Sequence, residues 1–325
     1  EEGYYFIDSE EAEWNTGREG TRNLGYKVQY KGGYHAAPPL DRTFNIRSEM
    51  TSLLKDVGIH LKYHHHEVGG GGQHEIETAF NEMVTMADQS MIVKYFVKNH
   101  AFRSNKSATF MPKPLFNEPG SGLHVHQYLA DKNGSIFYDK NGPARFSKIG
   151  LYYIGGLLKH AAAIFAFTNP STNSYKRLVP GFEAPVWGTY SVANRTACIR
   201  IPGYIRQKEV QRLEFRPPDG TCNPYLAYTA MLMAGLEGIR NKIDPGQPVD
   251  KNLTYLPEKE LAKIPLLPTS LTKALDALER DYKFLLQGGV FTEDLIESWI
   301  NLKRKDVEEI RIRPHPWEFH LYYDK

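Results

Sequence analysis

The chain has 325 residues, of which 41% are hydrophobic and 24% are charged, and this is the composition of a globular protein with a sizeable core. Its 40 basic and 38 acidic side chains leave a formal charge of +2, which excludes the strongly basic class of nucleic-acid-binding proteins. The most apolar run, residues 154–167, is interrupted by Lys159 and His160 and is too short to cross a bilayer, so we expect neither a nucleic-acid partner nor a membrane partner.

The two cysteines and the opening residues bear on the cellular compartment. Cys198 and Cys222 are far apart and lack a CxxC spacing, which favours reduced, buried thiols over a disulfide framework. No signal peptide opens the sequence. Both features predict a cytoplasmic protein.

The first elements along the chain predict mixed α and β structure. Residues 3–8 read as a strand, and the apolar spacing of residues 47–57 predicts a helix. Residues 62–77, KYHHHEVGGGGQHEIE, predict two strands around a glycine loop. Residues 77–100 predict a long helix with Phe80 on its apolar stripe, whose default role is core packing.

The hairpin at residues 62–77 is unusually polar. Because side chains alternate along a strand, His65 shares a face with Glu67, and Glu75 shares a face with Glu77. Burying such a face costs free energy unless something binds there, and carboxylates suit hard divalent cations. A solvated edge hairpin with a flexible tip is the alternative.

A second polar strand is predicted within residues 116–130. His124 and His126 fall on one face, and Gly120 just before them lets the backbone approach a ligand closely. Histidines at i and i+2 on a strand suit a metal or a phosphate, and a structural role is the alternative.

Residues 168–188 predict a loop, because prolines and glycines interrupt any regular element. Lys176, Arg177 and Glu183 lie there among apolar neighbours, which is typical of a mobile loop that takes part in chemistry. An ordinary surface loop is the alternative.

Two further strands are predicted at residues 193–202 and 211–219, and each carries charged side chains. These are Arg195 and Arg200 on the first strand, and Arg212, Glu214 and Arg216 on one face of the second. An Arg-Glu-Arg face can be solvated, but it also suits an acidic substrate beside a cation.

The rest of the chain predicts helices. Thr221 or Asn223 can cap a central helix that begins at Pro224, and further helices are expected at residues 270–287 and 292–311. The aromatic tail, residues 310–325, would expose much apolar surface on a monomer, so a subunit contact is expected. One α+β domain, residues 1–325, with a helical C-terminal third is the simplest division.

Together these strands would line a sheet-walled cavity with cations at one end and arginines at the other. Phosphoryl transfer to an anionic acceptor needs this arrangement, because cations hold nucleotide phosphates while arginines neutralise the moving phosphoryl group. The sequence contains neither a GxxxxGK[ST] P-loop nor the protein-kinase motif set.

Six ordered motifs give the chain a family resemblance. They are HHEVGGGGQHE (65–75), KPLFNEPGSGLHVH (113–126), NSYKRLVPGFEAP (173–185), NRTACIRIP (194–202), RLEFRPPD (212–219) and NPYLA (223–227). Through them the chain resembles the catalytic domain of bacterial type I glutamine synthetases. The resemblance implies a curved antiparallel sheet that lines an active-site funnel, with helices around it.

The resemblance also implies roles for the polar residues. The implied metal ligands are Glu67 and Glu75 for one divalent ion, and His124 and Glu214 for a second. The implied nucleotide and phosphoryl contacts are Phe80, His126, Arg195 and Arg200. The implied glutamate contacts are Gly120, Arg177, Glu183 and Arg216. Catalytic roles would fall to Arg195 beside the transferred group, to Arg216 at the glutamate, and to Glu183. Glu183 would close over the site and help to remove a proton from the ammonium-derived adduct.

The reaction implied by the resemblance has two steps. ATP phosphorylates the γ-carboxylate of L-glutamate, and ammonia then displaces phosphate to give L-glutamine. Two to three Mg²⁺ or Mn²⁺ ions per site would assist, in a homo-oligomer that is a dodecamer in intact members.

The sequence also departs from the family pattern. Members carry a preceding β-grasp domain and a Glu-x-Glu strand that gives one acid to each metal, and the spacing from Glu1 and Glu2 to the WNTG turn places these residues one hairpin later than that strand. We therefore expect the acidic strand upstream of residue 1, and weak activity without it.

Three readings of function follow. The first is glutamine synthesis. A non-catalytic glutamine synthetase-like protein and a ligase that joins glutamate to a larger amine are the alternatives.

Overall fold

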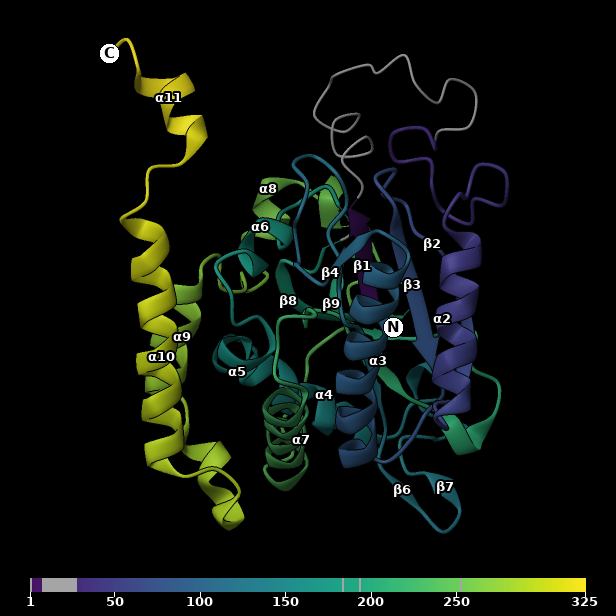
Figure 1. Cartoon of the computed structure of the whole chain (residues 1–325). Coiled ribbons are helices and arrows are strands. Elements are labelled where there is room, and N and C mark those ends of the chain that lie inside the picture. The colour runs from purple at the N-terminus through teal and green to yellow at the C-terminus, as the bar shows by residue number, and fades with distance from the viewer. Residues whose placement is uncertain (1, 8–27, 183, 193, 252) are drawn as a thin grey trace.

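The computed structural model describes residues 2–7, 28–182, 184–192, 194–251 and 253–325 (Figure 1). Its strands are β1 Glu2–Ile7, β2 Leu61–His66, β3 Gln73–Thr78, β4 Ser107–Thr109, β5 Val125–Gln127, β6 Ala130–Asp131, β7 Gly134–Ser135, β8 Trp187–Val192, β9 Ala197–Ile201 and β10 Leu213–Phe215. Its longer helices are α2 Phe44–Asp56, α3 Met83–Arg103, α4 Lys148–Lys159, α5 Ala161–Thr168, α7 Pro224–Arg240, α9 Leu271–Arg280 and α10 Glu293–Arg311. Shorter helices are α6 Ser174–Arg177, α8 Glu258–Leu261 and α11 Pro316–Tyr322.

Two four-stranded sheets carry most of the polar strands identified in the sequence. The first has the order β2-β3-β1-β4, and all its neighbours are antiparallel. The second has the order β5-β10-β9-β8. Its β8–β9 pair is parallel, which differs from the purely antiparallel sheet expected from the sequence. The α+β fold class itself is confirmed.

The first sheet is polar on one face and apolar on the other. Ile76 of β3 is buried with Met50 and Leu54 of α2 and with Val97 of α3. Because neighbours along a strand point to opposite faces, Glu75 and Glu77 are directed away from these helices. Helices α2 and α3 therefore cover one face of the hairpin and leave the acidic face available (Figure 1).

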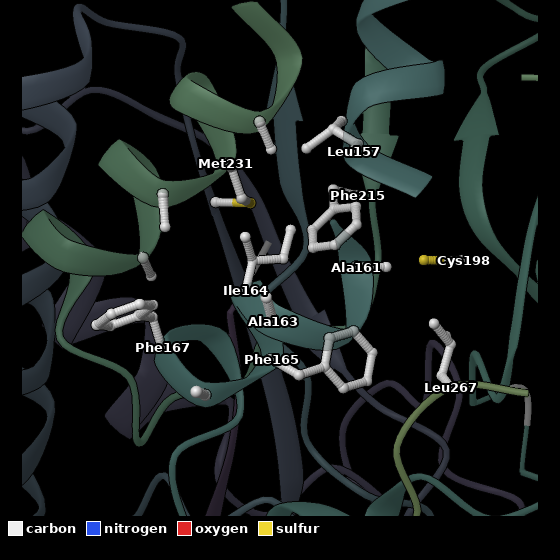
Figure 2. Packing of buried hydrophobic residues seen from close by; sticks show 14 of the residues in the cluster. Leu157, Ala161, Ala163, Ile164, Phe165, Phe167, Cys198, Phe215, Met231 and Leu267 are labelled. Carbon is white, nitrogen blue, oxygen red and sulfur yellow. The ribbon is translucent and has the colours of Figure 1, made fainter. Parts of the chain in front are cut away.

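The main core surrounds α5. All but one of its eight residues are buried, and Ile164 lies between Phe215 of β10 and Met231 of α7 (Figure 2). Cys198 and Cys222 are buried free thiols, as the sequence predicted.

Helices α4 and α5 meet at a bend of 74°. At the bend His160 is buried and stacks on Phe284, with ring centroids 3.9 Å apart. Its Nδ1 lies 2.7 Å from Asp281 Oδ2, and its Nε2 lies 3.2 Å from Glu237 Oε2. These tertiary contacts explain why the helix breaks at this residue.

Among the described residues, no single helix is both long enough and apolar enough to cross a membrane. The bent pair of α4 and α5 passes the same test by length and composition only.

The boundary between β3 and α3 differs from the sequence prediction, whereas one of the two predicted caps of α7 is confirmed. Strand β3 continues to Thr78 and α3 begins at Met83, so Phe80 lies in the connecting loop and not on a helical stripe. Asn223, and not Thr221, caps α7, because its side chain accepts hydrogen bonds from the backbone of Tyr225 and Leu226.

The C-terminal helices lie far from the hairpin. Helix α10 buries only Ile296 and Ile300, and α11 extends beyond the body of the molecule (Figure 1). Trp317, Phe319 and Tyr323 are exposed in this tail, in line with the apolar surface expected from the sequence.

Helices α4 and α7 pack closely at a pair of glycines. A Cβ on Gly156 would lie 2.0 Å from the carbonyl oxygen of Ala234 and 2.7 Å from the amide nitrogen of Gly238. Both are backbone atoms, so one helix would have to shift. We expect Gly156→Ala to lower the free energy of unfolding by about 1–3 kcal/mol despite the higher helix propensity of alanine, measured by urea denaturation.

The control for this substitution is Gly188→Ala in β8, where a Cβ would meet its nearest neighbour at 3.4 Å. If both variants changed stability equally, close helix packing at Gly156 would be disproved.

Candidate active site

The acidic face of the hairpin gathers three potential metal ligands. The register pairs His65 with Glu75 across β2 and β3, so these side chains share a face. His65 Nε2 lies 3.3 Å from Glu75 Oε1 and 4.0 Å from Glu67 Oε1. The ligand atoms of all three residues lie within 4.8 Å of one another. The structure therefore brings together Glu67 and Glu75, as the sequence predicted, and adds His65 beside them.

The electrostatics of this acid cluster, His65, Glu67 and Glu75, favour a bound cation. Burial and the neighbouring charge of Glu75 raise the pKa of Glu67 to about 7. Burial lowers the pKa of His65, but the hydrogen bond to Glu75 and the nearby carboxylates outweigh this effect and raise it to about 8. A divalent cation would relieve the repulsion between the two carboxylates, and oxygen donors with one imidazole suit Mg²⁺ or Mn²⁺.

Glu77 takes a separate role at the edge of this face. Its carboxylate forms an ion pair with Lys62, whose ammonium group lies 5.0 Å from the centre of the Phe80 ring. Glu77 therefore orients a basic side chain toward the aromatic residue expected to contact the nucleotide.

Strand β1 lies directly beside the acid cluster. It pairs with β3 along Glu2–Tyr5. The register puts Gly3 opposite Glu75. The position that faces Glu75 on this strand is thus a glycine, while Glu1 lies outside the described residues.

A second charged group lies on the other sheet. Glu214 of β10 is fully buried, and its Oε1 lies 2.6 Å from Arg216 NH1 and 3.4 Å from His124 Nδ1. Its Oε2 forms an ion pair with Nε of Arg200. The structure therefore unites the predicted ligands His124 and Glu214 with two of the predicted arginines, and a cation here would compete with both guanidinium groups for the same carboxylate.

Arg177 is buried and braces the backbone that carries Arg216. Its NH1 donates to the carbonyl oxygens of Pro217 (2.7 Å) and Pro218 (3.3 Å), and its NH2 donates to that of Arg216 (3.1 Å). A Cβ on Gly120 would lie 2.6 Å from Arg177 Cγ, so the arginine needs a glycine at this position. The structure brings Gly120, Arg177 and Arg216 together, and in it Arg177 holds the segment of Arg216 in place.

Phe80 borders a cavity of about 450 Å³ between β3, β5, α3 and α7. Its ring lies 6.2 Å from that of His126 and 5.5 Å from that of Tyr128, while the Arg212 guanidinium lies 4.7 Å from its centre. The inner wall is apolar, with Met86, Val93 and Met231. An aromatic edge beside an apolar cavity and basic groups suits a purine nucleotide.

Two predicted residues are not in these groups. Arg195 is exposed in the turn before β9, and Glu183 lies outside the described residues. Just before Glu183, the ring of Phe182 lies 3.8 Å from the Lys113 ammonium group and 4.6 Å from that of Lys31.

Sequence reasoning missed the buried side chains behind the hairpin. Arg47 contacts His64 and His74, and Thr43 contacts His74. Asp41 accepts from both Arg47 and Thr43, and nothing in the motif containing His74 indicated these partners. Only the unusual number of histidines in the hairpin could have indicated that buried polar partners lie behind it.

Comparisons with known proteins agree with this arrangement. The family model described as "Glutamine synthetase, catalytic domain" matches residues 1–322. A glutamine synthetase of Frankia alni is 55% identical over 322 residues, which cover 98% of this chain and 68% of that protein. A glutamine synthetase of a Nostoc species is 53% identical, and the match covers 69% of that protein.

Solved structures show the same likeness. A Plasmodium falciparum glutamine synthetase superimposes with a TM-score of 0.85 at 29% identity, over 99% of this chain and 74% of that one. The ADP complex of GmaS gives a TM-score of 0.83 at 30% identity, over all of this chain and 72% of that one. The chain therefore belongs to the glutamine synthetase family.

Proposed function

We propose that this chain carries out the ATP-dependent ligation of ammonia to the γ-carboxylate of L-glutamate, giving L-glutamine, ADP and phosphate through γ-glutamyl phosphate. The observation that carries this proposal is the acid cluster, positioned in a chain that is 51–55% identical to curated glutamine synthetases along nearly its whole length. The non-catalytic alternative is not favoured, because these relatives are named as enzymes.

Glu67, Glu75 and His65 are the proposed holders of one divalent ion, Mg²⁺ or Mn²⁺. When bound, the ion would neutralise phosphate charge during transfer. The crowding of two carboxylates on a partly buried face supports this assignment. His124 and Glu214 are the proposed holders of a second ion.

Phe80 and His126 are the proposed contacts of the adenine-bearing nucleotide. Lys62 and Arg212, which lie beside the Phe80 ring, add positive charge where phosphates would leave the cavity. The basic side chains near this aromatic edge support the assignment.

The arginines of the second sheet are the proposed stabilisers of the transferred phosphoryl group. Ion pairs with Glu214 hold Arg200 and Arg216 close together on this sheet, which supports the assignment. Arg195 is the proposed third arginine, and Glu183 the proposed group that accepts the proton from the ammonium-derived adduct. Gly120 and Arg177 would shape the glutamate pocket, with Arg177 acting through Arg216.

We also propose that residues 1–325 form one catalytic domain in a cytoplasmic homo-oligomer. Gln73 Nε2 donates to the carbonyl oxygen of Gly120 (3.0 Å), and Ser90 Oγ lies 2.9 Å from Tyr228 OH, so the hairpin side is joined to the main core by polar contacts. The exposed aromatic residues of α11 support a contact with another copy of the chain.

The test of this function is Glu67→Gln. The change keeps the shape of the side chain but removes the negative charge, so divalent-ion affinity should fall about 10- to 100-fold. Glutamine formation at limiting Mg²⁺ should fall in parallel, measured with ATP, glutamate and ammonium.

The matched control is Glu49→Gln on α2, whose carboxylate is exposed and pairs with His100. Equal glutamine formation by Glu67→Gln and by the unmodified chain at limiting Mg²⁺ would contradict the assignment.

The raised pKa values predict proton release on metal binding. At pH 7 His65 is mostly protonated and Glu67 is about half protonated, so a cation must displace these protons. We expect Mn²⁺ affinity to rise from pH 6 to pH 9, and proton release to be present at pH 7 and nearly absent at pH 9. Calorimetry in two buffers with different ionisation enthalpies measures this release, and equal heats in both buffers at pH 7 would rule it out.

Phe80→Ala tests the nucleotide contact. Loss of base stacking should raise the KM for ATP on the order of 10-fold while the KM for glutamate stays unchanged. Phe102→Ala on the exposed face of α3 is the control. An unaltered KM for ATP in Phe80→Ala would contradict the assignment of Phe80 as a nucleotide contact.

A further inference from the structure

Arg47 of α2 joins both strands of the hairpin on the face opposite the acid cluster. Its Nε donates to His64 Nδ1 of β2 (2.8 Å), and its NH1 donates to His74 Nδ1 of β3 (2.8 Å). Its NH2 donates to Asp41 Oδ2 at 2.6 Å. Because Arg47 is only 1% exposed, its guanidinium depends on these protein partners.

These contacts belong to a closed ring of hydrogen bonds. An arginine can only donate, so Nδ1 of His74 accepts and its Nε2 carries the proton. That proton is donated to Thr43 Oγ1 at 2.7 Å, and the Thr43 hydroxyl donates to Asp41 Oδ1 at 3.1 Å. Asp41 then accepts from Arg47, which closes the ring.

The ring excludes a cation at this place. Asp41, His66 and His74 offer three ligand atoms within 4.8 Å of one another. However, both nitrogens of His74 and both carboxylate oxygens of Asp41 already have hydrogen-bond partners. A metal ion would have to break these bonds.

The ring contacts the strands immediately before the acid cluster. Arg47 binds His64 and His74. His64 comes one residue before His65 of the acid cluster, and His74 comes one residue before Glu75. Because neighbouring residues of a strand point to opposite faces, Arg47 holds β2 and β3 on one face of the hairpin while the acid cluster lies on the other face.

We propose that Asp41, Thr43, Arg47 and His74 form a positioning network that sets the spacing of Glu67 and Glu75 and thereby the affinity of the site for a divalent cation. This inference rests on the proposed function of the acid cluster. A cation needs both carboxylates at binding distance at the same time, and a fixed backbone keeps them there without reorganisation.

Thr43→Val tests the network. Valine has nearly the same shape but no hydroxyl, so the link from His74 to Asp41 is lost while the Arg47–Asp41 ion pair stays. We expect Mn²⁺ affinity, measured by electron paramagnetic resonance titration of the full chain without substrates, to weaken about 10-fold. Thr43→Ser restores the hydroxyl and should restore most of the affinity.

Two controls separate positioning from general stability. Thr51→Val makes the same change inside α2, the helix that Thr43 immediately precedes. The Thr51 hydroxyl donates to the carbonyl oxygen of Ser48, so this variant should leave Mn²⁺ affinity unchanged. The melting temperature of each variant is measured in parallel, because a purely structural role lowers it in Thr43→Val without changing Mn²⁺ affinity.

The outcomes are distinct. Weaker Mn²⁺ binding in Thr43→Val but not in Thr43→Ser or Thr51→Val supports the network. Equal Mn²⁺ affinity in Thr43→Val and Thr43→Ser overturns it while the cation site stands. Mn²⁺ binding by the unmodified chain that Glu67→Gln does not weaken overturns the cation site itself, and the network's role with it.

Discussion

The close approach of Glu67 and Glu75 on one face of the β2–β3 hairpin is the constraint on which the rest of the site depends. Two buried carboxylates this close together are unfavourable when both are ionised, so burial and the charge of Glu75 raise the pKa of Glu67 to about 7. Apolar contacts of Ile76 and polar contacts of Arg47 stabilise the opposite face of the hairpin and offset this unfavourable energy. The hairpin is therefore held in a conformation that favours cation binding.

The second sheet, β5-β10-β9-β8, carries the positively charged side chains of the site. Glu214 has no exposed surface, and its charge is balanced by Arg200 and Arg216. Arg177 at the end of α6 donates to the carbonyl oxygens of residues 216–218, so the position of Arg216 depends on an element that is distant along the chain. One sheet thus presents negative charge and the other presents fixed positive charge, as phosphoryl transfer from a metal-bound nucleotide to a carboxylate requires.

Much of this could be predicted from the sequence, because alternation within single strands is a local property. Alternation placed His65 with Glu67 and His124 with His126, whereas the family resemblance paired Glu67 with Glu75 and His124 with Glu214, and both of these last pairs meet in the structure. Phe80 was misplaced on a helix, since the apolar spacing around it fits a strand end and a loop equally well.

The remaining features depend on contacts between distant parts of the chain. The bend at His160 is fixed by Asp281, which lies 121 residues later, and the Arg47–His74 contact joins residues 27 apart. The pairing of β1 with β3 likewise follows from sheet register and not from spacing along the chain. The spacing of apolar and polar residues within one segment does not show which distant residues will contact it.

The position of a bound cation decides whether Glu67 and Glu75 form a metal site. Anomalous diffraction from crystals grown with Mn²⁺ locates the ion independently of activity. We expect a peak within about 2.5 Å of carboxylate oxygens from both Glu67 and Glu75. A peak among Asp41, His66 and His74 behind the hairpin, with none at the acid cluster, would contradict it.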